Sequence, residues 1–244
     1  NILNPANGAP ITVPAQDMVL GLYYITKLRK GAKGEGLTFY GPEEALIAYN
    51  EGKVDIHAIV NVVVKDLDKD GKIVDVMMKE TSVGRVIVNE IVPAEVGYLN
   101  TIISKKSLRD IISDVIKAVG VARACEFLDG IKNLGYYMAF KGGLSFNLGD
   151  IIIPKEKEEL VKRGNEEVEQ IMMNYNMGFI TDNERYNQVI DTWTHVNSDL
   201  SDILYKTIKN DDQGFNSVFM MLDSGARGSK EQIRQLSGMR GLMA

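Results

Sequence analysis

A basic window at the end of the given sequence, Ser224–Ala244, is the first place where side chains could do chemistry. Its charged residues are Arg227, Lys230, Arg234, Arg240 and the acid Glu231. Arg227 lies between Gly225 and Gly228, and small neighbours let a ligand approach the backbone. A guanidinium there suits a phosphate, because its planar fork can donate to two oxygens at once. A glycine turn leading into a helix with exposed arginines explains the same pattern, so the residues alone leave both interpretations open.

A second candidate is an acidic run that resembles half of a calcium-binding loop. Asp66, Asp68, Asp70 and Gly71 match the first half of an EF-hand loop. The twelfth position, where calcium needs a bidentate carboxylate, is Met77. Because β-branched runs flank the segment, it predicts the turn of a β-hairpin instead.

The other residues that could bind a ligand or take part in catalysis belong to no recognised sequence motif. The glycine-rich run Gly31–Gly36 lacks the strand–turn–helix context of a phosphate-binding loop. His57 and His195 belong to no metal or nucleophile motif, and we expect both to be structural or solvated. Cys125 is the single cysteine, so it cannot form an internal disulfide. This cysteine usage predicts a reduced, cytoplasmic protein.

Composition limits the classes of function. The 244 residues include 28 basic and 33 acidic side chains, a formal net charge of −5, and 45% are apolar. An acidic balance argues against a protein that holds nucleic acid through its whole surface. We expect no membrane partner, because no apolar run reaches the roughly 20 residues of a membrane span, and no signal peptide is recognisable. The chain starts at Asn1 without methionine, which suggests a piece of something longer.

The first part of the chain predicts a mixture of helices and strands. Met18–Lys27 is mostly apolar and predicts a buried helix, and Pro42 followed by acids predicts a short one. Ile56–Val64 and Ile73–Met78 are rich in β-branched residues and predict the paired strands of a hairpin. Gly84 then ends the extended run.

From Ser107 the apolar spacing becomes helical. The apolar residues of Leu108–Val119 follow a 3.6-residue period, and a second helical stretch runs from about Ala122 to Phe140. Leu144–Ile153 predicts a short extended segment.

The segment after Pro154 predicts two charged helices joined by a short turn. Each has a narrow apolar seam, and Thr181 with Glu184 forms a capping box at the start of the second helix. We therefore expect a projecting antiparallel helical hairpin, whose tip, Met177–Arg185, is exposed and mobile. The fold class expected is α+β, mixed at first and mainly helical later. We expect four parts: residues 1–103, a wall segment with short strands and helices; 104–153, a helical segment; 154–208, the hairpin; and 209–244, a basic loop.

Several motifs together resemble one family, the largest catalytic subunit, β′, of bacterial RNA polymerase. They occur in the family's order and cover essentially the whole chain. The last one, with its Gln-Ile-Arg-Gln-Leu and Gly-Met-Arg-Gly-Leu-Met runs, is highly specific. The motifs are Asn1–Gly8, Pro14–Asp17, Gly21–Tyr24, Ser82–Arg85, Glu184–Asn187, Ile190–Asp191 with Trp193, and Ser224–Ala244.

The resemblance implies where the chain works. In the family this stretch follows the aspartate motif that holds the catalytic Mg²⁺ and precedes the trigger loop. It lines the secondary channel, through which nucleoside triphosphates enter and the 3′ end of backtracked RNA leaves. We therefore expect no metal or cofactor bound by this chain, Mg²⁺ in the parent enzyme, and an inactive isolated fragment of a nucleotidyltransferase.

The resemblance also assigns roles to single residues. Arg227 matches an arginine that faces the triphosphate of the incoming nucleotide. Gln16 and Asp17 match the inner wall of the channel. A loop that supports the bridge helix is matched by Gln232, Arg234 and Gln235.

Partners are implied in the same way. They are the β, α, ω and σ subunits and the coiled-coil factors of the Gre and DksA kinds, which dock on the hairpin. The docking pattern, which includes a site for the alarmone guanosine tetraphosphate in some members, is matched by Asp129, Tyr186, Asn187 and Asp191. Gln188 stands where other members carry a lysine, and the loss of that cation argues against the alarmone site. Without the resemblance, the hairpin equally suits a free-standing helical adaptor that recruits proteins.

Overall fold

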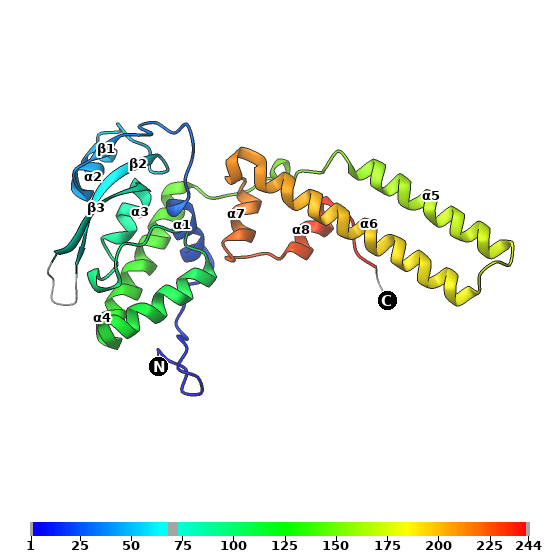
Figure 1. Ribbon diagram of the computed structural model, residues 1–244, viewed down its shortest axis with the longest axis horizontal. Coiled ribbons are helices and arrows are strands. Elements are labelled where there is room, and N and C mark those ends of the chain that lie inside the picture. The colour runs from blue at the N-terminus through cyan, green and yellow to red at the C-terminus, as the bar shows by residue number, and fades with distance from the viewer. Residues whose placement is uncertain (1, 68–72, 243–244) are drawn as a thin grey trace. The chain divides into compact units, whose positions relative to one another are not determined.

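A computed structural model describes residues 2–67 and 73–242 of the chain (Figure 1). Most elements are helices, and the strands form one small sheet, which confirms the predicted α+β class. The chain forms two compact units. The first comprises Asn1–Ser145 and Met220–Arg227, and the second comprises Phe146–Phe219 and Gly228–Ala244. The four-part division expected from the sequence stays a prediction.

The sheet lies in the first unit and has the order β1-β2-β3. Its strands are β1 (Thr38–Phe39), β2 (Ile59–Leu67) and β3 (Ile73–Ser82). β1 is parallel to β2, whereas β2 and β3 are antiparallel, which confirms the predicted hairpin. Val60, Val62 and Val64 alternate along β2 and are buried, because successive strand residues face opposite sides. The turn residues Asp68, Asp70 and Gly71 lie outside the described residues.

Three short helices belong to the same unit, and the second and third of them pack against the strands. They are α1 (Asp17–Thr26), α2 (Pro42–Asn50) and α3 (Val83–Asn89). The first two confirm the helices predicted at Met18 and Pro42. The third was not predicted, since its β-branched residues favour strands. Its start is fixed by Ser82, whose hydroxyl accepts a hydrogen bond from the backbone N–H of Arg85.

The longest helix in the described residues is α4 (Lys105–Gly142). A short 3-10 turn, η1 (Ala94–Val96), lies between α3 and α4. Ser104 and Ser107 form a capping box at the start of α4. Gly120 interrupts it with φ of 75° and ψ of 175°, values that only glycine adopts easily. The two helical stretches predicted on either side of this position are therefore confirmed.

Helices α1 and α4 cross at two glycines, Gly21 and Gly135. A Cβ atom on Gly21 would lie 2.0 Å from the carbonyl oxygen of Gly135, so the backbones touch without intervening side chains. This close crossing lets apolar residues of both helices share one core. The largest buried side chains of that core include Leu22, Ile25, Ile103, Leu108, Ile112 and Ile131.

The second unit is built mainly from helices. Its elements are η2 (Leu148–Asp150), α5 (Lys157–Asn176), α6 (Asp182–Asn210), η3 (Asp211–Gly214) and α8 (Lys230–Ser237). Helix α7 (Ser217–Asp223) begins in this unit and ends in the first. The prediction of an extended segment over Leu144–Ile153 is wrong for Leu148–Asp150, which form the 3-10 turn η2. Asn147 accepts hydrogen bonds there from the N–H groups of Gly149 and Asp150 and closes a 3-10 turn.

Helices α5 and α6 form the predicted antiparallel hairpin (Figure 1). The predicted capping box is present. Hydrogen bonds from the backbone N–H and hydroxyl of Thr181 hold the pKa of Glu184 below its ordinary value. Trp193 and Val196 of α6 pack over Gly164 of α5, where no side chain intervenes. The tip is exposed as expected, with Phe179 at 74%, while its mobility stays a prediction.

Candidate functional site

The loop that carries Arg227 joins the end of α7 to the start of α8. Gly225 and Gly228 adopt positive φ angles of 71° and 91°, which turn the chain sharply on either side of Arg227. Within the loop, the Ser224 hydroxyl accepts a hydrogen bond from the N–H of Ala226 at 3.2 Å. The N–H of Arg227 donates to the carbonyl oxygen of Met221 at 3.4 Å. The loop backbone is therefore tied to the last turn of α7.

The side chain of Arg227 extends from this fixed backbone into solvent. It is exposed, and no residue in the described part of the chain pairs with its guanidinium. By contrast, Arg123 pairs with Glu95 and Arg185 pairs with Asp182. Arg227 is thus a cation whose hydrogen-bond donors are available to an anionic ligand.

The residues expected to support a bridge helix lie on α8. Ser229 and Gln232 form a capping box, so the side chain of Gln232 is engaged in starting the helix. Arg234 pairs with Glu231, and its Nε atom is buried without a partner among the described residues. Gln235 is exposed. Gln232 and Arg234 thus make contacts within α8 itself, whereas Gln235 is exposed.

Gln16 and Asp17, expected at the channel wall, begin α1. Both are exposed. Gln16 has φ of 52° and ψ of −123°, a rare conformation for a residue other than glycine. Its carbonyl oxygen accepts a hydrogen bond from the N–H of Leu20, which starts the helix. The Gln16–Asp17 pair therefore lies at the surface of the first unit, at the start of α1.

The residues expected to dock regulatory factors are divided between the two units. Asp129 lies on α4 in the first unit and pairs with Lys132, with 2.6 Å between Oδ1 and Nζ. Tyr186, Asn187 and Asp191 lie on α6 in the second unit, all exposed, Tyr186 at 60%. Asn187 and Asp191 are four residues apart, so they share one face of the helix.

A shallow hollow beside Asp191 was not foreseen from the sequence. It is lined from α5 by Arg163, Glu167 and Ile171, and from α6 by residues including Gln188, Asp191 and His195. Arg163 also reaches Asp199 of α6, at 3.5 Å between Nη2 and Oδ2. The alternating charges along each helix were visible in the sequence, but which charges meet depends on the register of the hairpin.

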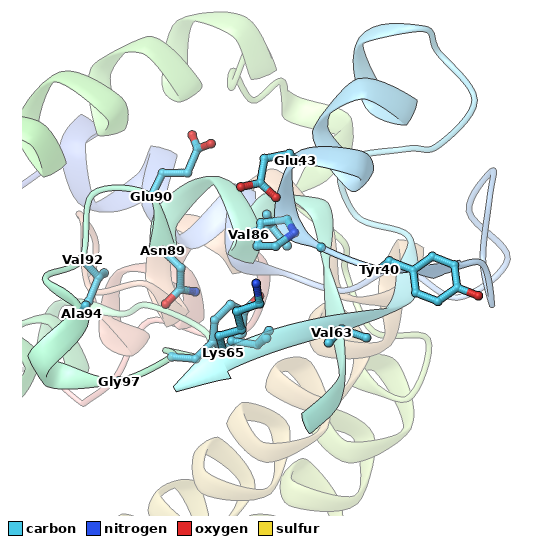
Figure 2. Close-up of a pocket in the computed structure, with 14 residues that line it drawn as sticks. Tyr40, Glu43, Val63, Lys65, Val86, Asn89, Glu90, Val92, Ala94 and Gly97 are labelled. Atoms are coloured by element: carbon cyan, nitrogen blue, oxygen red, sulfur yellow. The ribbon is translucent and has the colours of Figure 1, made fainter. Parts of the chain in front are cut away.

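The first unit also contains a cavity of about 400 Å³ beside β2 and α3 (Figure 2). Lys65 of β2, Glu43 of α2 and Glu90 at the end of α3 bring charges to its lining, and Tyr40 follows β1 (Figure 2). None of the residues assigned a role from the sequence lines it. Its lining comes from separate elements, so no local pattern could reveal it.

The structure bears on metal binding and on membrane crossing in the residues that it describes. The described residues contain no group of three or more His, Cys, Asp or Glu side chains that could hold a metal ion. Across residues 2–67 and 73–242, no helix is long and apolar enough to cross a membrane.

Comparison with protein-family models gives two matches. Residues 1–151 match the family described as RNA polymerase Rpb1, domain 3. Residues 180–244 match RNA polymerase Rpb1, domain 4. The first match includes the Gln16–Asp17 pair, and the second includes Tyr186, Asp191 and Arg227.

Curated proteins match along the whole chain. Over 244 residues the chain is 87% identical to a protein of Bacteroides fragilis named DNA-directed RNA polymerase subunit beta′. The subunit of the same name from Bacteroides thetaiotaomicron is 86% identical, and that from Flavobacterium johnsoniae is 57% identical over 249 residues. In each case all of this chain is covered, and it spans 17% of the length of the relative. The chain therefore belongs to the RNA polymerase Rpb1 family, together with the bacterial β′ subunits that it matches.

Proposed function

We propose that this chain works in DNA-directed RNA synthesis as part of a β′ subunit and lines the secondary channel. Through that channel nucleoside triphosphates enter and backtracked RNA leaves. The names of the relatives support a role in transcription. The channel assignment rests on the motifs that the sequence shares with the family, above all Ser224–Ala244.

The observation that carries the proposal is the free guanidinium of Arg227. In a chain with a formal charge of −5, it is an exposed cation on a loop whose backbone is fixed. A polyanion that arrives transiently needs such a donor, because a preorganised fork binds two oxygens with little loss of conformational freedom. Arg227 would hold and orient the triphosphate, while Mg²⁺ bound elsewhere in the enzyme would neutralise charge on the phosphates.

The hairpin formed by α5 and α6 would serve regulation in the cytoplasm. Its exposed residues Tyr186, Asn187 and Asp191 offer an aromatic ring, an amide and a carboxylate to a coiled-coil factor of the Gre or DksA kind. The other partners would be the remaining polymerase subunits. The family matches lie on both sides of the first hairpin helix, which favours a polymerase subunit over a free-standing adaptor.

Replacing Arg227 by alanine in the assembled polymerase tests the nucleotide contact. One charge-assisted hydrogen bond contributes about 1.5–3 kcal/mol. We therefore expect kcat/KM for single-nucleotide addition to fall about 10- to 100-fold, at 1.4 kcal/mol per decade. Rapid-quench kinetics on a preassembled elongation complex measure this value.

Arg109→Ala is the matched control, because it removes the same charge from an exposed position on α4. Its kcat/KM should equal that of the wild type. If Arg227→Ala stays within about twofold of the wild type on this scale, Arg227 is only a loop residue and the assignment is refuted.

A further inference from the structure

We propose that Tyr23 is a positioning residue for Arg227 and acts through Asp223. This inference rests on the proposed contact between Arg227 and the nucleotide triphosphate. It adds a second residue to that contact, from an element far away in the sequence.

Tyr23 lies in the middle of α1 and is 1% exposed. Its hydroxyl donates a hydrogen bond to Oδ2 of Asp223, with 2.7 Å between the oxygens. Asp223 is the last residue of α7, directly before the loop that carries Arg227. The two partners are 200 positions apart, yet both belong to the first unit. The hydrogen bond therefore anchors the start of the loop to a buried helix.

Lys27, the residue directly after α1, sets the direction of this hydrogen bond. Lys27, which is 7% exposed, places Nζ 3.2 Å from the Tyr23 hydroxyl oxygen and 5.1 Å from the centre of its ring. An ammonium group can only donate, so the hydroxyl accepts from Lys27 and directs its own proton to Asp223. Successive hydrogen bonds of this kind strengthen one another in a buried setting.

A second anchor holds the next residue of the loop. The N–H of Lys105, at the start of α4, donates to the carbonyl oxygen of Ser224 at 2.8 Å. A Cβ atom on Gly225 would lie only 3.2 Å from the Cβ of Lys105, so the loop runs directly against α4. Ala226 packs against the apolar core of the first unit.

Three hydrogen bonds hold the loop up to Arg227. Asp223 is held by α1, Ser224 by α4, and the Arg227 N–H by the last turn of α7. The exposed guanidinium thus extends from a backbone whose position is set by hydrogen bonds to α1, α4 and α7. Releasing Asp223 would widen the range of positions that the guanidinium samples, and a looser cation binds a triphosphate less well.

The test is a double-mutant cycle in the assembled polymerase. Tyr23→Phe removes only the hydroxyl, and Asp223→Asn keeps the shape of its partner without the charge. We expect each to lower kcat/KM for single-nucleotide addition about three- to tenfold, the range of one hydrogen bond. If the hydroxyl acts through Arg227, Tyr23→Phe should change kcat/KM by less than about twofold in an Arg227→Ala enzyme.

Tyr49→Phe is the matched control. It removes a tyrosine hydroxyl that also bonds a charged group, Nζ of Lys141 at 2.8 Å, in the same unit. Its kcat/KM should equal that of the wild type, and the thermal stability of both Tyr→Phe enzymes should be compared.

The possible results separate the inference from the proposed function. An equal loss for Tyr23→Phe in the wild-type and Arg227→Ala backgrounds means a general structural effect and overturns the inference. Unchanged kinetics for Tyr23→Phe and Asp223→Asn, beside a clear loss for Arg227→Ala, overturn it while the proposed function stands. Unchanged kinetics for Arg227→Ala refute both.

Discussion

His57 links the stability of the first unit to pH through a single buried side chain. It is 4% exposed, and its Nδ1 lies 3.0 Å from the carbonyl oxygen of Lys27. Burial lowers the pKa of His57 below 6.5, and the nearby cations Arg29 and Lys27 act in the same direction. The hydrogen bond to Lys27 and the charge of Asp55 oppose the shift without cancelling it.

The sign of the pH dependence follows from this lowered pKa. The unfolded chain takes up a proton at His57 near pH 6.5, whereas the folded chain does so only at lower pH. In that window the unfolded state binds more protons, so the free energy of unfolding falls as the pH drops below about 6.5. We expect the urea midpoint of this chain to decrease between about pH 7.5 and pH 5.5.

A His57→Gln variant serves as the reference for this titration. It should lose most of the decrease in that pH window, since ordinary carboxylates titrate below about pH 5. The same decrease in the variant and the wild type would assign the effect to other groups.

At the scale of elements, the contact between Gly21 and Gly135 fixes how α1 and α4 cross. A methyl group on Gly21 would lie 2.0 Å from a backbone oxygen, which cannot rotate away as a side chain can. We therefore expect Gly21→Ala to lower the free energy of unfolding by at least about 3 kcal/mol. Urea denaturation of this chain measures the loss.

Gly52→Ala separates crowding from backbone strain. Gly52 has φ of 67°, and a Cβ atom there would meet nothing within 4 Å. Its replacement should cost only about 1–2 kcal/mol, the strain of a left-handed residue. Equal losses for the two variants would contradict a steric role for Gly21.

The helices and strands show which elements a sequence can predict. The hairpin formed by α5 and α6 was predictable, because its apolar seams and the Thr181–Glu184 box are local signals. Helix α3 was not, since its start depends on Ser82 and on its packing against α1. A Cβ on Gly84 would lie 1.9 Å from the carbonyl oxygen of Ile25. Contacts of that kind join residues far apart in the chain and leave no periodic pattern.

In the candidate site, too, the local features were predictable from the sequence and the long-range contacts were not. Arg227 was predictable from its charge, its glycine neighbours and the family motif. Its anchoring to Tyr23 was not, because the two partners, Tyr23 and Asp223, each look like ordinary helix residues and lie 200 positions apart. The sequence thus predicted Arg227 as a candidate for ligand contact but not the hydrogen bond between Tyr23 and Asp223.

At the scale of the whole molecule, the proposed docking residues Tyr186 and Asp191 belong to the second unit, whereas Arg227 belongs to the first. We expect Tyr186→Ala or Asp191→Ala in the assembled polymerase to weaken binding of a Gre-type factor about tenfold or more, as for a central interface residue. Elongation without the factor should be unchanged. A binding titration with the labelled factor measures the effect.

Asp202→Ala is the control for the two docking variants. Asp202 is exposed on the same helix, about three turns beyond Asp191, and its loss changes the charge of the helix equally. If the wild type and both docking variants bind the factor with equal affinity, the proposed docking of the factor on the hairpin is refuted.

The division of the first unit into Asn1–Ser145 and Met220–Arg227 has a consequence for how the protein is made. A ribosome releases the first segment well before the second, because all of Phe146–Phe219 is synthesised between them. At about 5–20 residues per second, this delay is on the order of ten seconds. During that time Asp223, which accepts the hydrogen bond from Tyr23, has not yet been synthesised. Ala226, which packs against the apolar core of the first unit, has not been synthesised either. The first segment is therefore synthesised, and can begin to fold, before the contacts that Asp223 and Ala226 make with it can form.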